Sequence, residues 1–230
     1  MEKIVILTGA GISAESGLGT FRDAGGLWAQ HRIEDVATPE GFARDPALVQ
    51  AFYNARRAKA ATARPNAAHE ALARLQAAWP GEVVIVTQNV DELHEKGGAQ
   101  GVLHMHGILS GALCATCGHR WPAPAEMAAG EPCPACHAPT ARPDIVWFGE
   151  MPYDMDEIFE HLVNADLFAA IGTSGQVYPA AGFVQEATAA GSRTVELNLE
   201  PSATVSQFDE TRFGPATQTV PEWVAELLAG

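Results

Sequence analysis

The sequence predicts an α/β fold with a parallel β-sheet that is covered by helices on both faces. Short apolar segments recur along the chain, segments with helical character separate them, and this alternation is typical of such sheets. Glycines and polar residues directly follow two of the apolar segments, at the strand ends where open parallel sheets bind ligands. The expected strands are Ile4–Leu7, Val83–Thr87, Leu167–Ile171 and Thr194–Leu199.

Helices are expected between these strands and at the end of the chain. The first two follow helix-start signals, Asp45-Pro46 and Pro65-Asn66, because a capping residue or a proline in the first turn favours a helix start. The expected helices are Pro46–Lys59, Asn66–Ala78, Ala180–Ala190 and Pro221–Leu228.

The first strand leads into a glycine-rich turn of the form G-x-G-x-x-A, which runs from Gly9 to Ala14. Gly9 permits a tight turn, Gly11 leaves room for a pyrophosphate, and the small Ala14 lets the next helix pack closely. The first N–H groups of that helix would face the anion. The turn therefore predicts a dinucleotide site.

The acidic residue of an ordinary dinucleotide site is missing. It is expected at a strand end about 20 residues after the turn. Asp23 comes too early, and Glu34 and Asp35 follow no evident strand. The segment from Ser16 to Asp23 indicates an irregular loop instead. This is not the start of an ordinary dehydrogenase.

Polar residues crowd the end of the second strand. Gln88, Asn89 and Asp91 follow Val83–Thr87, and we expect them to line a crevice with one of the two histidines of the segment His104-Met105-His106-Gly107. Such a cluster is typical of an active site. The alternative is that Asn and Asp only turn and cap the chain after a buried strand.

The four cysteines of the chain form two C-x-x-C pairs, Cys114 with Cys117 and Cys133 with Cys136. Two such pairs predict a tetrahedral zinc site, and four thiolates with no open position make it structural rather than catalytic. Two disulfides or a redox pair are the alternatives, but no export signal and the presence of two pairs favour zinc. His119 or His137 remains a substitute ligand.

Composition favours a single catalytic domain in the cytoplasm. The chain has 230 residues, of which 47% are hydrophobic, and this allows one large core plus a small insertion. A net charge of −14 argues against direct nucleic-acid binding and favours basic polypeptide partners. Because a strand is expected directly after Lys3 and no long apolar segment occurs, we expect neither a leader peptide nor a membrane span.

Together these motifs resemble the sirtuin family of NAD-dependent protein lysine deacylases, over nearly the whole chain. Mild departures at Gly19, Val90 and Gly97 concern loop stiffness rather than chemistry. The matching motifs, in the family's order, are Gly9-Ala10-Gly11-Ile12-Ser13, Thr20-Phe21-Arg22, Thr87-Gln88-Asn89-Val90-Asp91 with Leu93-His94, His106-Gly107, the four cysteines, Val146-Trp147-Phe148-Gly149-Glu150, Gly172-Thr173-Ser174 and Asn198-Leu199-Glu200.

The resemblance implies that NAD is bound and consumed. Gly9–Ser13 and Thr173–Ser174 would hold phosphates, Asn198 and Glu200 the adenosine ribose, and Gln88–Asp91 the nicotinamide end. Phe21 and Arg22 would close over the ribose, and Ala216 would line the adenine pocket. The full implied set is Gly9, Ala10, Gly11, Ser13, Thr20, Phe21, Arg22, Trp28, Gln88, Asn89, Val90, Asp91, Gly172, Thr173, Ser174, Asn198, Leu199, Glu200 and Ala216.

The implied chemistry makes Asn89 and His106 catalytic. The acyl oxygen attacks the ribose carbon that carries nicotinamide, and His106 then removes a ribose hydroxyl proton, a task that suits a histidine pKa near 6.5. Water finally releases lysine and 2′-O-acyl-ADP-ribose. His104 is the competitor, because two residues apart on an extended strand both would face the same side. His69, His94 and His161 are interpreted as helix-surface or packing residues.

The acyl preference also has a sequence signal. Tyr53 and Arg56 share one helix face and resemble the pair with which class III sirtuins bind succinyl and malonyl carboxylates, while Ala37 resembles the small residue of their acyl pocket. The alternative is an ordinary helix face with Arg56 in solvent. Val146, Phe148 and Gly149 would form a strand edge to which the substrate peptide adds, and a core strand is the alternative there.

The resemblance also implies a division of the chain into parts, and it leaves two alternative functions. The Rossmann-like part would cover about 1–30, 65–109 and 143–230, a helical insertion about 31–64, and the zinc module about 110–142 of one sirtuin-type domain, 1–230. A sirtuin-like mono-ADP-ribosyltransferase and a non-catalytic NAD-sensing zinc module remain alternatives. The sequence leaves the protein substrates, relative acyl rates and oligomeric state open.

Overall fold

The structure is a computed structural model that describes residues 1–19 and 31–230, and these form two compact units. The first unit consists of Met1–Leu18, Arg64–Met105 and Asp154–Gly230. The second consists of the described residues within Gly19–Ala63 and of His106–Tyr153. The expected helical insertion and zinc module thus share one unit, and residues 106–109 and 143–153 belong to it rather than to the Rossmann-like part.

The first unit contains a parallel sheet with strand order β3-β2-β1-β7-β8-β9. The chain therefore moves outward from β1 in one direction and later returns to its other side at β7. Ligands of parallel α/β sheets bind at such a switch point. The strands are β1 (Lys3–Thr8), β2 (Glu82–Thr87), β3 (Leu103–His104), β7 (Leu167–Ile171), β8 (Arg193–Asn198) and β9 (Glu210–Phe213).

The four strands expected from apolar segments are confirmed, with end shifts of one residue or so. They were recognisable because both sheet faces are covered, so that nearly every residue of each strand is buried. The strands β3 and β9 were not expected. β3 has two half-buried residues and β9 alternates half-buried and exposed ones, so neither has a continuous apolar segment.

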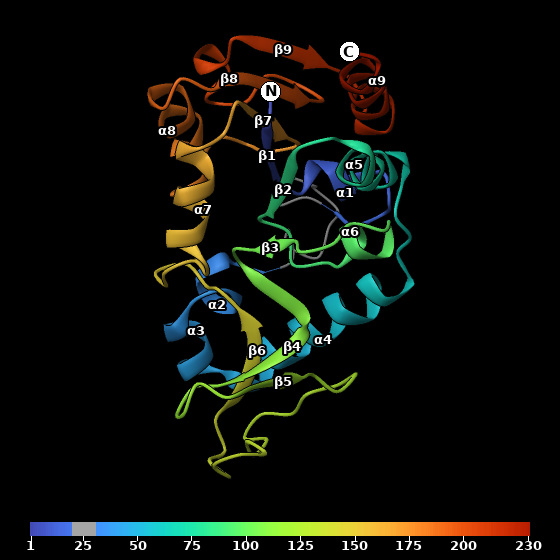
Figure 1. Cartoon of the computed structure of the whole chain (residues 1–230). Coiled ribbons are helices and arrows are strands. Elements are labelled where there is room, and N and C mark those ends of the chain that lie inside the picture. The colour runs from blue at the N-terminus through green and yellow to red at the C-terminus, as the bar shows by residue number, and fades with distance from the viewer. Residues whose placement is uncertain (20–30) are drawn as a thin grey trace. The chain divides into compact units, whose positions relative to one another are not determined.

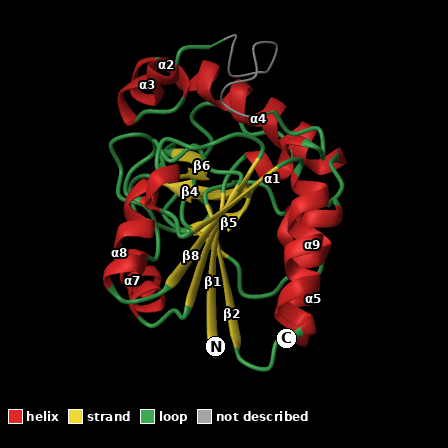
Figure 2. Cartoon of the chain, turned by 90° about the horizontal axis from the view of Figure 1, so that it is seen from above, coloured by secondary structure: helices red, strands yellow, loops and turns green. Residues whose placement is uncertain are grey.

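Helices cover both faces of this sheet, as the fold class requires (Figures 1 and 2). α5 (Ala67–Ala78) and α9 (Ala216–Ala229) pack on one face through a core that includes Leu72 and Trp223. α7 (Met155–Val163) and α8 (Phe183–Ala189) cover the other face, with Ile158 and Phe183 in a second core. Short elements complete the unit: α1 (Gly11–Ala14), α6 (Leu93–Lys96), the 3₁₀ turn η2 (Ala180–Gly182) and η3 (Val205–Gln207).

Two of the expected helices differ from the structure. The expected helix Ala180–Ala190 divides into η2 and the shorter α8. The C-terminal helix begins at Ala216, not at Pro221, which lies inside α9. A helix start at Pro221 is the ordinary expectation, because proline lacks the N–H that an interior helix position needs.

The second unit combines a small antiparallel sheet, of strand order β5-β4-β6, with helices. Its strands are β4 (Gly107–Cys114), β5 (Arg120–Pro122) and β6 (Ala141–Ile145), and its helices are α2 (Ile33–Val36), α3 (Pro39–Arg44) and α4 (Pro46–Thr62). The expected helix over Pro46–Lys59 is therefore confirmed as α4. The antiparallel sheet was not expected from the sequence.

Polar side chains of α4 fasten this helix to the sheet. Gln50 donates to the carbonyl of Ala141 at 3.0 Å, and Arg57 Nε donates to the carbonyl of Leu109 at 2.8 Å. Because these groups are buried, their hydrogen bonds avoid the cost of unpaired polar atoms. The helix that carries Tyr53 thus has a fixed place on β4 and β6.

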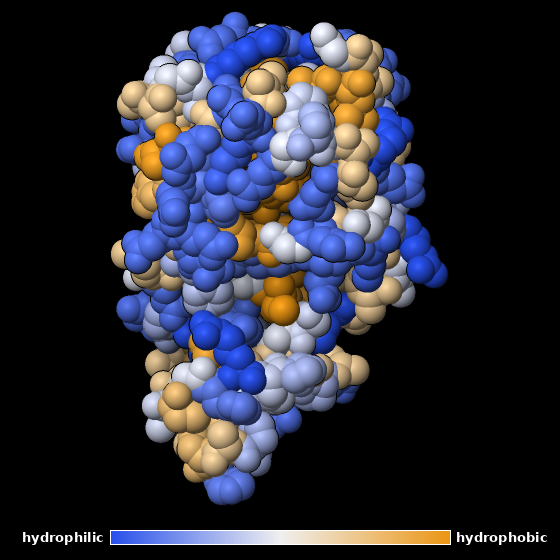
Figure 3. All heavy atoms as spheres, viewed as in Figure 1, coloured by the Kyte–Doolittle hydropathy of each residue, from blue (hydrophilic) through white to orange (hydrophobic). Residues whose placement is uncertain are grey.

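Within the described ranges, no helix has both the length and the apolar character needed to cross a membrane. Hydrophilic residues cover most of the face seen in Figure 3, with hydrophobic residues in smaller groups among them.

Candidate active site

The glycine-rich turn after β1 packs against the turn after β7. Gly9 N donates to Ile171 O at 3.0 Å, and Gly11 N donates to Gly172 O at 2.9 Å. A Cβ on Gly11 would lie 2.7 Å from Gly172 Cα, and one on Gly9 would lie 2.8 Å from Gly172 O. The structure thus gives a different reason for the glycines than room for a pyrophosphate: the two backbones are in direct contact.

The amides at this turn are largely used within the protein. Gly11 N, Ile12 N and Ser13 N donate to the carbonyls of Gly172, Gly9 and Ala10, at 2.9, 3.2 and 3.2 Å. The expectation that the first helical N–H groups point freely at an anion is therefore wrong for these residues. The reason is that α1 has only four residues and its first turn is bonded to its own neighbours.

Asn89 lies against the same turn. Its side-chain amide donates to Gly9 O at 3.1 Å and to Ser13 Oγ at 3.1 Å, and its side chain is buried. β1 and β2 are neighbours in register, with Thr8 opposite Thr87, so their two carboxyl ends meet. The expected meeting of the glycine turn and the polar cluster is confirmed.

Hydroxyl groups beneath Asn89 fix its backbone. Asn89 N donates to Thr87 Oγ1 at 3.0 Å, and Thr8 Oγ1 donates to the same oxygen at 2.8 Å. His94 Nε2 lies 2.9 Å from Thr8 Oγ1. Because the Thr8 hydroxyl already donates its proton to Thr87, the His94 ring is the donor in this contact. Three buried groups therefore hold the position of one loop residue.

Asp91 is both a site candidate and a turn residue. Its carboxylate accepts from Leu93 N, the first residue of α6, at 3.1 Å, so the expectation that Asp turns the chain here is correct, whereas the N-cap residue of α6 is Glu92. Burial raises the pKa of Asp91, and hydrogen bonds from Leu93 and Ser13 oppose that rise. The carboxyl group is buried beside the turn that carries Asn89.

The two candidate histidines do not share a strand face. His104 ends β3, whereas His106 lies in the turn before β4 and belongs to the second unit. The two side chains therefore do not face the same side of one extended strand, as was expected, because the chain turns between them. His104 Nδ1 lies 3.2 Å from Asn89 O, so His104 is the histidine that contacts the polar cluster within the first unit.

His104 is held by Glu95, whose carboxylate lies 2.7 Å from Nε2. Burial alone would lower the pKa of His104, but the hydrogen bond and charge of Glu95 outweigh it, and the pKa is raised. Because both ring nitrogens of His104 face acceptors, Asn89 O and the Glu95 carboxylate, the ring suits a fixed structural contact better than proton abstraction. His106 is half-buried, and its carbonyl accepts from Val146 N at 2.9 Å.

His69 and His94 are packing residues, and neither lies on a helix surface. Both rings are buried in the first unit. Burial lowers the pKa of His69 to about 4 and, with smaller effects from His69 and His104, the pKa of His94 to about 3. Both are therefore neutral near pH 7. His161, on α7, is partly buried beside Glu157.

The loops after β7 and β8 bring together the candidates for the adenosine end. Asn198 Nδ2 donates to Thr173 O at 2.7 Å and to Glu196 Oε1 at 3.2 Å. Glu196 is fully buried and also accepts from Ser202 N at 3.1 Å. Glu196 was not among the residues expected here, because it lies inside an apolar strand, where its charge is the one available signal.

The remaining candidates of this region lie on the same loops or on α9. Gly172 has a φ of +63°, and Ser174 Oγ accepts from Gln176 N at 3.3 Å. Leu199 and Glu200 are exposed, and Ala216 is the first residue of α9. A small cavity in the first unit is lined by residues that include Gln88 and Thr173. Thr20, Phe21, Arg22 and Trp28 lie outside the described residues.

The acyl-pocket candidates lie together in the second unit. Tyr53 is 1% exposed, and the guanidinium carbon of Arg56 lies 5.6 Å from the centre of its ring. Ala37 is also buried, and its carbonyl accepts from Phe148 N at 3.0 Å. The expected proximity of Tyr53 and Arg56 is confirmed, and Arg56 also lies over the ring of Phe52 at 5.8 Å.

The segment Val146–Gly149 lies after the end of β6 and is not a strand, so the core-strand interpretation is wrong, and its role in binding a substrate peptide stays a prediction. β6 ends at Ile145, and Gly149 has a φ of +93°. Val146 N and Phe148 N donate to His106 O and Ala37 O, while Trp147 N donates to the Glu150 carboxylate at 2.8 Å. These three amides are already bonded, so an added peptide strand would need other partners.

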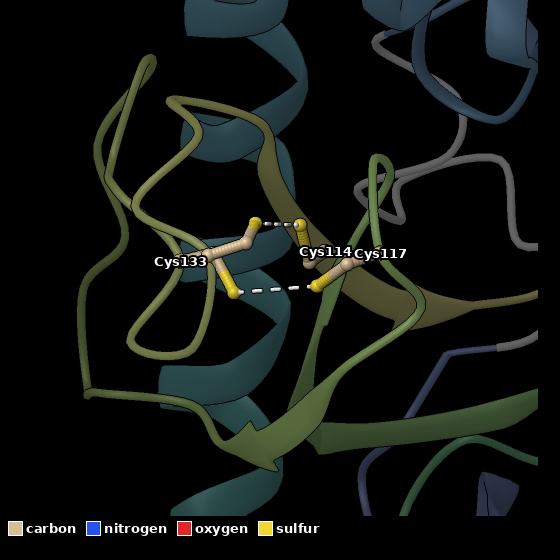
Figure 4. A group of neighbouring side chains, drawn as sticks. Cys114, Cys117 and Cys133 are labelled. Atoms are coloured by element: carbon tan, nitrogen blue, oxygen red, sulfur yellow. Dashed lines mark hydrogen bonds between the residues drawn. The ribbon is translucent and has the colours of Figure 1, made fainter.

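The four cysteines converge in the second unit (Figure 4). Their sulfur atoms all lie within 4.8 Å of one another, with Cys114 3.6 Å from Cys136 and Cys117 3.8 Å from Cys133. A tetrahedron with zinc–sulfur bonds of about 2.3 Å has sulfur–sulfur edges of about 3.8 Å. All four are free thiols, so the disulfide alternative is wrong and the set fits zinc.

The candidate substitute ligands lie outside this group. The metal-binding group found among the described residues consists of the four cysteines. The ring of His119 stacks on Trp121, with centroids 5.7 Å apart. His137 is exposed, and its backbone N donates to Cys133 O at 2.9 Å with a φ of +61°. His137 therefore shapes the turn that presents the second cysteine pair.

Comparison with known proteins places these features in one family. The model of the Sir2 family matches residues 9–179. The chain belongs to the Sir2 family. An NAD-dependent protein deacylase of Caulobacter vibrioides is 57% identical over 99% of this chain and 97% of its own length. A protein of the same name from Escherichia coli K12 is 56% identical over 100% of this chain and 84% of its own length.

Solved Sir2 structures share the fold. A Sir2 homologue in complex with NAD superposes with a TM-score of 0.90 at 36% identity, over 98% of this chain and 90% of that one. A Sir2 protein bound to acetylated peptide gives a TM-score of 0.80 at 25% identity, over 98% of this chain and 92% of that one. The family membership agrees with the parallel sheet and the clustered cysteines of the present structure.

Proposed function

We propose that this chain is an NAD-dependent protein lysine deacylase that removes acetyl, succinyl and malonyl groups and yields nicotinamide, free lysine and 2′-O-acyl-ADP-ribose. The observation that carries the proposal is the 54–58% identity, over 98% or more of the chain, to curated relatives named NAD-dependent protein deacylase. The Asn89 amide held against the glycine turn supports it, because this group sits where a parallel sheet binds its ligand.

NAD would be bound by the strand ends of the first unit. Ser13, Thr173 and Ser174 offer hydroxyl groups for phosphates, and Asn198 and Glu200 follow β8, where the adenosine ribose would lie. Since several turn amides are already bonded, we assign more of the phosphate binding to side-chain hydroxyls than the glycine motif suggests. Gln88, Asn89 and Asp91 would bind the nicotinamide end. NAD supplies the ribose carbon from which nicotinamide leaves and to which the acyl oxygen becomes attached.

His106 would act as the general base. It would accept the proton of a ribose hydroxyl, so that the hydroxyl oxygen can attack the acyl carbon and later carry the acyl group away from lysine. Asn89 would orient the reacting ribose through its carboxamide. His104, whose pKa is raised by Glu95, is engaged in holding the Asn89 loop instead.

An acidic acyl group would be recognised by Arg56 and Tyr53. A guanidinium presents parallel N–H donors that match a carboxylate, and a phenol adds one O–H donor. The pair lies on α4, which is fastened to β4 and β6, so its position does not depend on a mobile loop. Acetyl-lysine lacks the carboxylate and would occupy the same pocket beside Ala37 without these bonds.

The partner would be the acylated lysine of a protein substrate. The net charge of −14 favours basic substrate segments over nucleic acid. Four reduced thiols in a zinc-type cluster favour a reducing compartment, and we propose the cytoplasm.

The test is to measure nicotinamide release and lysine deacylation on paired acetyl- and succinyl-lysine peptides, with and without NAD. We expect release only when acyl peptide and NAD are both present, and 2′-O-acyl-ADP-ribose in equal amount. ADP-ribose found on protein instead would identify a mono-ADP-ribosyltransferase. NAD binding without nicotinamide release would identify a non-catalytic sensor.

A further inference from the structure

The phenol oxygen of Tyr53 receives a hydrogen bond from the indole of Trp147. The distance from Trp147 Nε1 to Tyr53 Oη is 3.0 Å. Tyr53 is 1% exposed and Trp147 is 2% exposed, so the bond is shielded from water. Burial raises the pKa of Tyr53, which keeps the phenol protonated near neutral pH.

Trp147 is itself held on several sides. The guanidinium carbon of Arg142 lies 3.5 Å from the centre of the Trp147 ring system, and the ring of Phe42 lies 5.2 Å from it. Glu150 accepts from the Trp147 backbone N at 2.8 Å. The indole therefore has one orientation, and its N–H has one direction.

Hydrogen bonds connect Arg142 and Glu150, two of the residues that contact Trp147. Arg142 donates to both carboxylate oxygens of Glu150, at 2.6 and 2.8 Å, and to the carbonyl of Ile145 at 2.8 Å. Bidentate pairs of this kind combine strength with a fixed geometry. The effect of Arg142 on Glu150 is visible in the carboxyl pKa, which burial would raise but which the hydrogen bonds and charge of Arg142 lower.

The hydrogen-bond chemistry of these groups determines where the phenol proton goes. An indole N–H and a guanidinium can only donate. Tyr53 therefore accepts from Trp147, and neither Trp147 nor Arg56 can take the phenol proton. The Tyr53 hydroxyl can therefore donate its proton only to a different group that accepts. An ionised carboxylate is such a group, because it has acceptor atoms and no donor. The arrangement suits an acidic acyl group.

We propose that Trp147 is a specificity-determining positioning residue: its N–H fixes the Tyr53 hydroxyl as a donor toward the carboxylate of a succinyl or malonyl group. The Arg142–Glu150 pair holds the indole in place for this role. The inference rests on the proposed deacylase function and adds to it a residue that acts through Tyr53.

The test is a double-mutant cycle with Trp147→Phe, Tyr53→Phe and the double variant. Phenylalanine keeps an aromatic ring beneath Arg142 but has no N–H. We measure kcat/KM on succinyl and acetyl peptides of one sequence. The succinyl-to-acetyl ratio should fall about fivefold in Trp147→Phe, as expected for one neutral hydrogen bond. In the double variant it should fall no further than in Tyr53→Phe alone.

Trp79→Phe is the matched control. Trp79 Nε1 is buried and has no hydrogen-bond partner among residues 1–19 and 31–230, so its loss should leave the ratio unchanged. If Trp147→Phe folds poorly, replacement of tryptophan by 3-benzothienylalanine removes the same donor at nearly constant volume. The ratio should then fall as in Trp147→Phe, and an unchanged ratio overturns the inference.

Two further results would also overturn it. An additive loss in the double variant would show that Trp147 does not act through Tyr53. Equal losses on both acyl groups would show a general structural role. The proposed function is judged separately: wild-type protein inactive on both peptides defeats it, and an unchanged ratio in Arg56→Met defeats its acidic-acyl part. A normal Arg56→Met effect beside an unchanged Trp147→Phe ratio defeats only the role of Trp147.

Discussion

His69 and His94 lie edge to face, with ring centroids 5.0 Å apart, inside the first unit. His94 contacts Thr8 Oγ1 at 2.9 Å, and His69 Nε2 lies 3.4 Å from Ser13 Oγ. His69 Nδ1 accepts from Asn66 N at 3.2 Å, so its proton is on Nε2. His69 thus supports Ser13, which contacts Asn89 directly, and His94 supports Thr8, which bonds the Thr87 hydroxyl that contacts Asn89.

This pair predicts a loss of stability in acid. Unfolded histidines have a pKa near 6.5, whereas burial lowers the pKa of His69 to about 4 and of His94 to about 3. Between these values the unfolded chain binds more protons than the folded one, so stability is retained above about pH 6.5 and lost as pH falls toward 4 and then 3.

Urea unfolding from pH 7.5 to 4.5 measures this effect. Each histidine should contribute a slope of up to about 1.4 kcal/mol per pH unit within its window. His94→Gln should flatten the curve, because an amide keeps a donor for Thr8 but takes up no proton. An equally steep curve in His94→Gln would show that carboxyl groups, not this ring, cause the acid sensitivity.

The zinc site predicts coupled loss of metal and folding in Cys133→Ser. Structural zinc contributes its binding free energy to folding, about 10 kcal/mol or more in small zinc domains. Bound metal per chain and the yield of folded protein should fall together, and activity should fall indirectly. His137→Ala should keep its metal, because His137 lies outside the group of four cysteines. Full activity after complete removal of the metal would contradict a structural role.

The sequence predicted those parts of the fold that depend on local pattern. β1, β2, β7 and β8 are apolar because both faces of the sheet are covered, so their segments were visible in the chain. The contact of Asn89 with the glycine turn followed from the rule that strand ends meet at one sheet edge. The cysteine spacing predicted a cluster that the structure contains.

Other features depend on contacts between distant segments and left no local signal. The role of Gly11 depends on Gly172, far along the chain, and the bonded amides of Val146 and Phe148 depend on His106 and Ala37. The separation of His104 from His106 depends on a turn that the segment His-Met-His-Gly does not reveal. The contact of Trp147 with Tyr53 left no local signal for the same reason, because Tyr53 lies far away in the sequence, on α4.

Replacement of each of the two histidines by alanine tests which of them is the general base. His106→Ala should reduce kcat at least about 100-fold while NAD affinity stays nearly constant, because a general base acts only in the chemical step. His104→Ala should reduce kcat much less and weaken NAD binding, since His104 contacts the Asn89 backbone. Steady-state kinetics with NAD titration measure both. A larger loss of kcat in His104→Ala would move the base to that residue.

Acyl selectivity provides the last prediction. Arg56→Met removes the charged donors while it keeps a long apolar side chain beside the rings of Phe52 and Tyr53. A succinyl carboxylate would then be buried without its partner, at a cost of about 2–4 kcal/mol in kcat/KM. Acetyl-lysine carries no carboxylate, so the succinyl-to-acetyl ratio should fall about 30- to 1000-fold. Tyr53→Phe should lower the ratio less, because it removes one neutral donor.

Arg74→Met is the control for this exchange, because Arg74 is an exposed arginine on α5 in the other unit, and its loss should leave the ratio unchanged. Comparing both peptides separates two roles of Arg56. If its stacking on Phe52 and Tyr53 only stabilises α4, turnover of both acyl groups should fall together and the ratio should stay constant. A constant ratio would therefore remove Arg56 from carboxylate recognition, even though deacylation itself remained NAD-dependent.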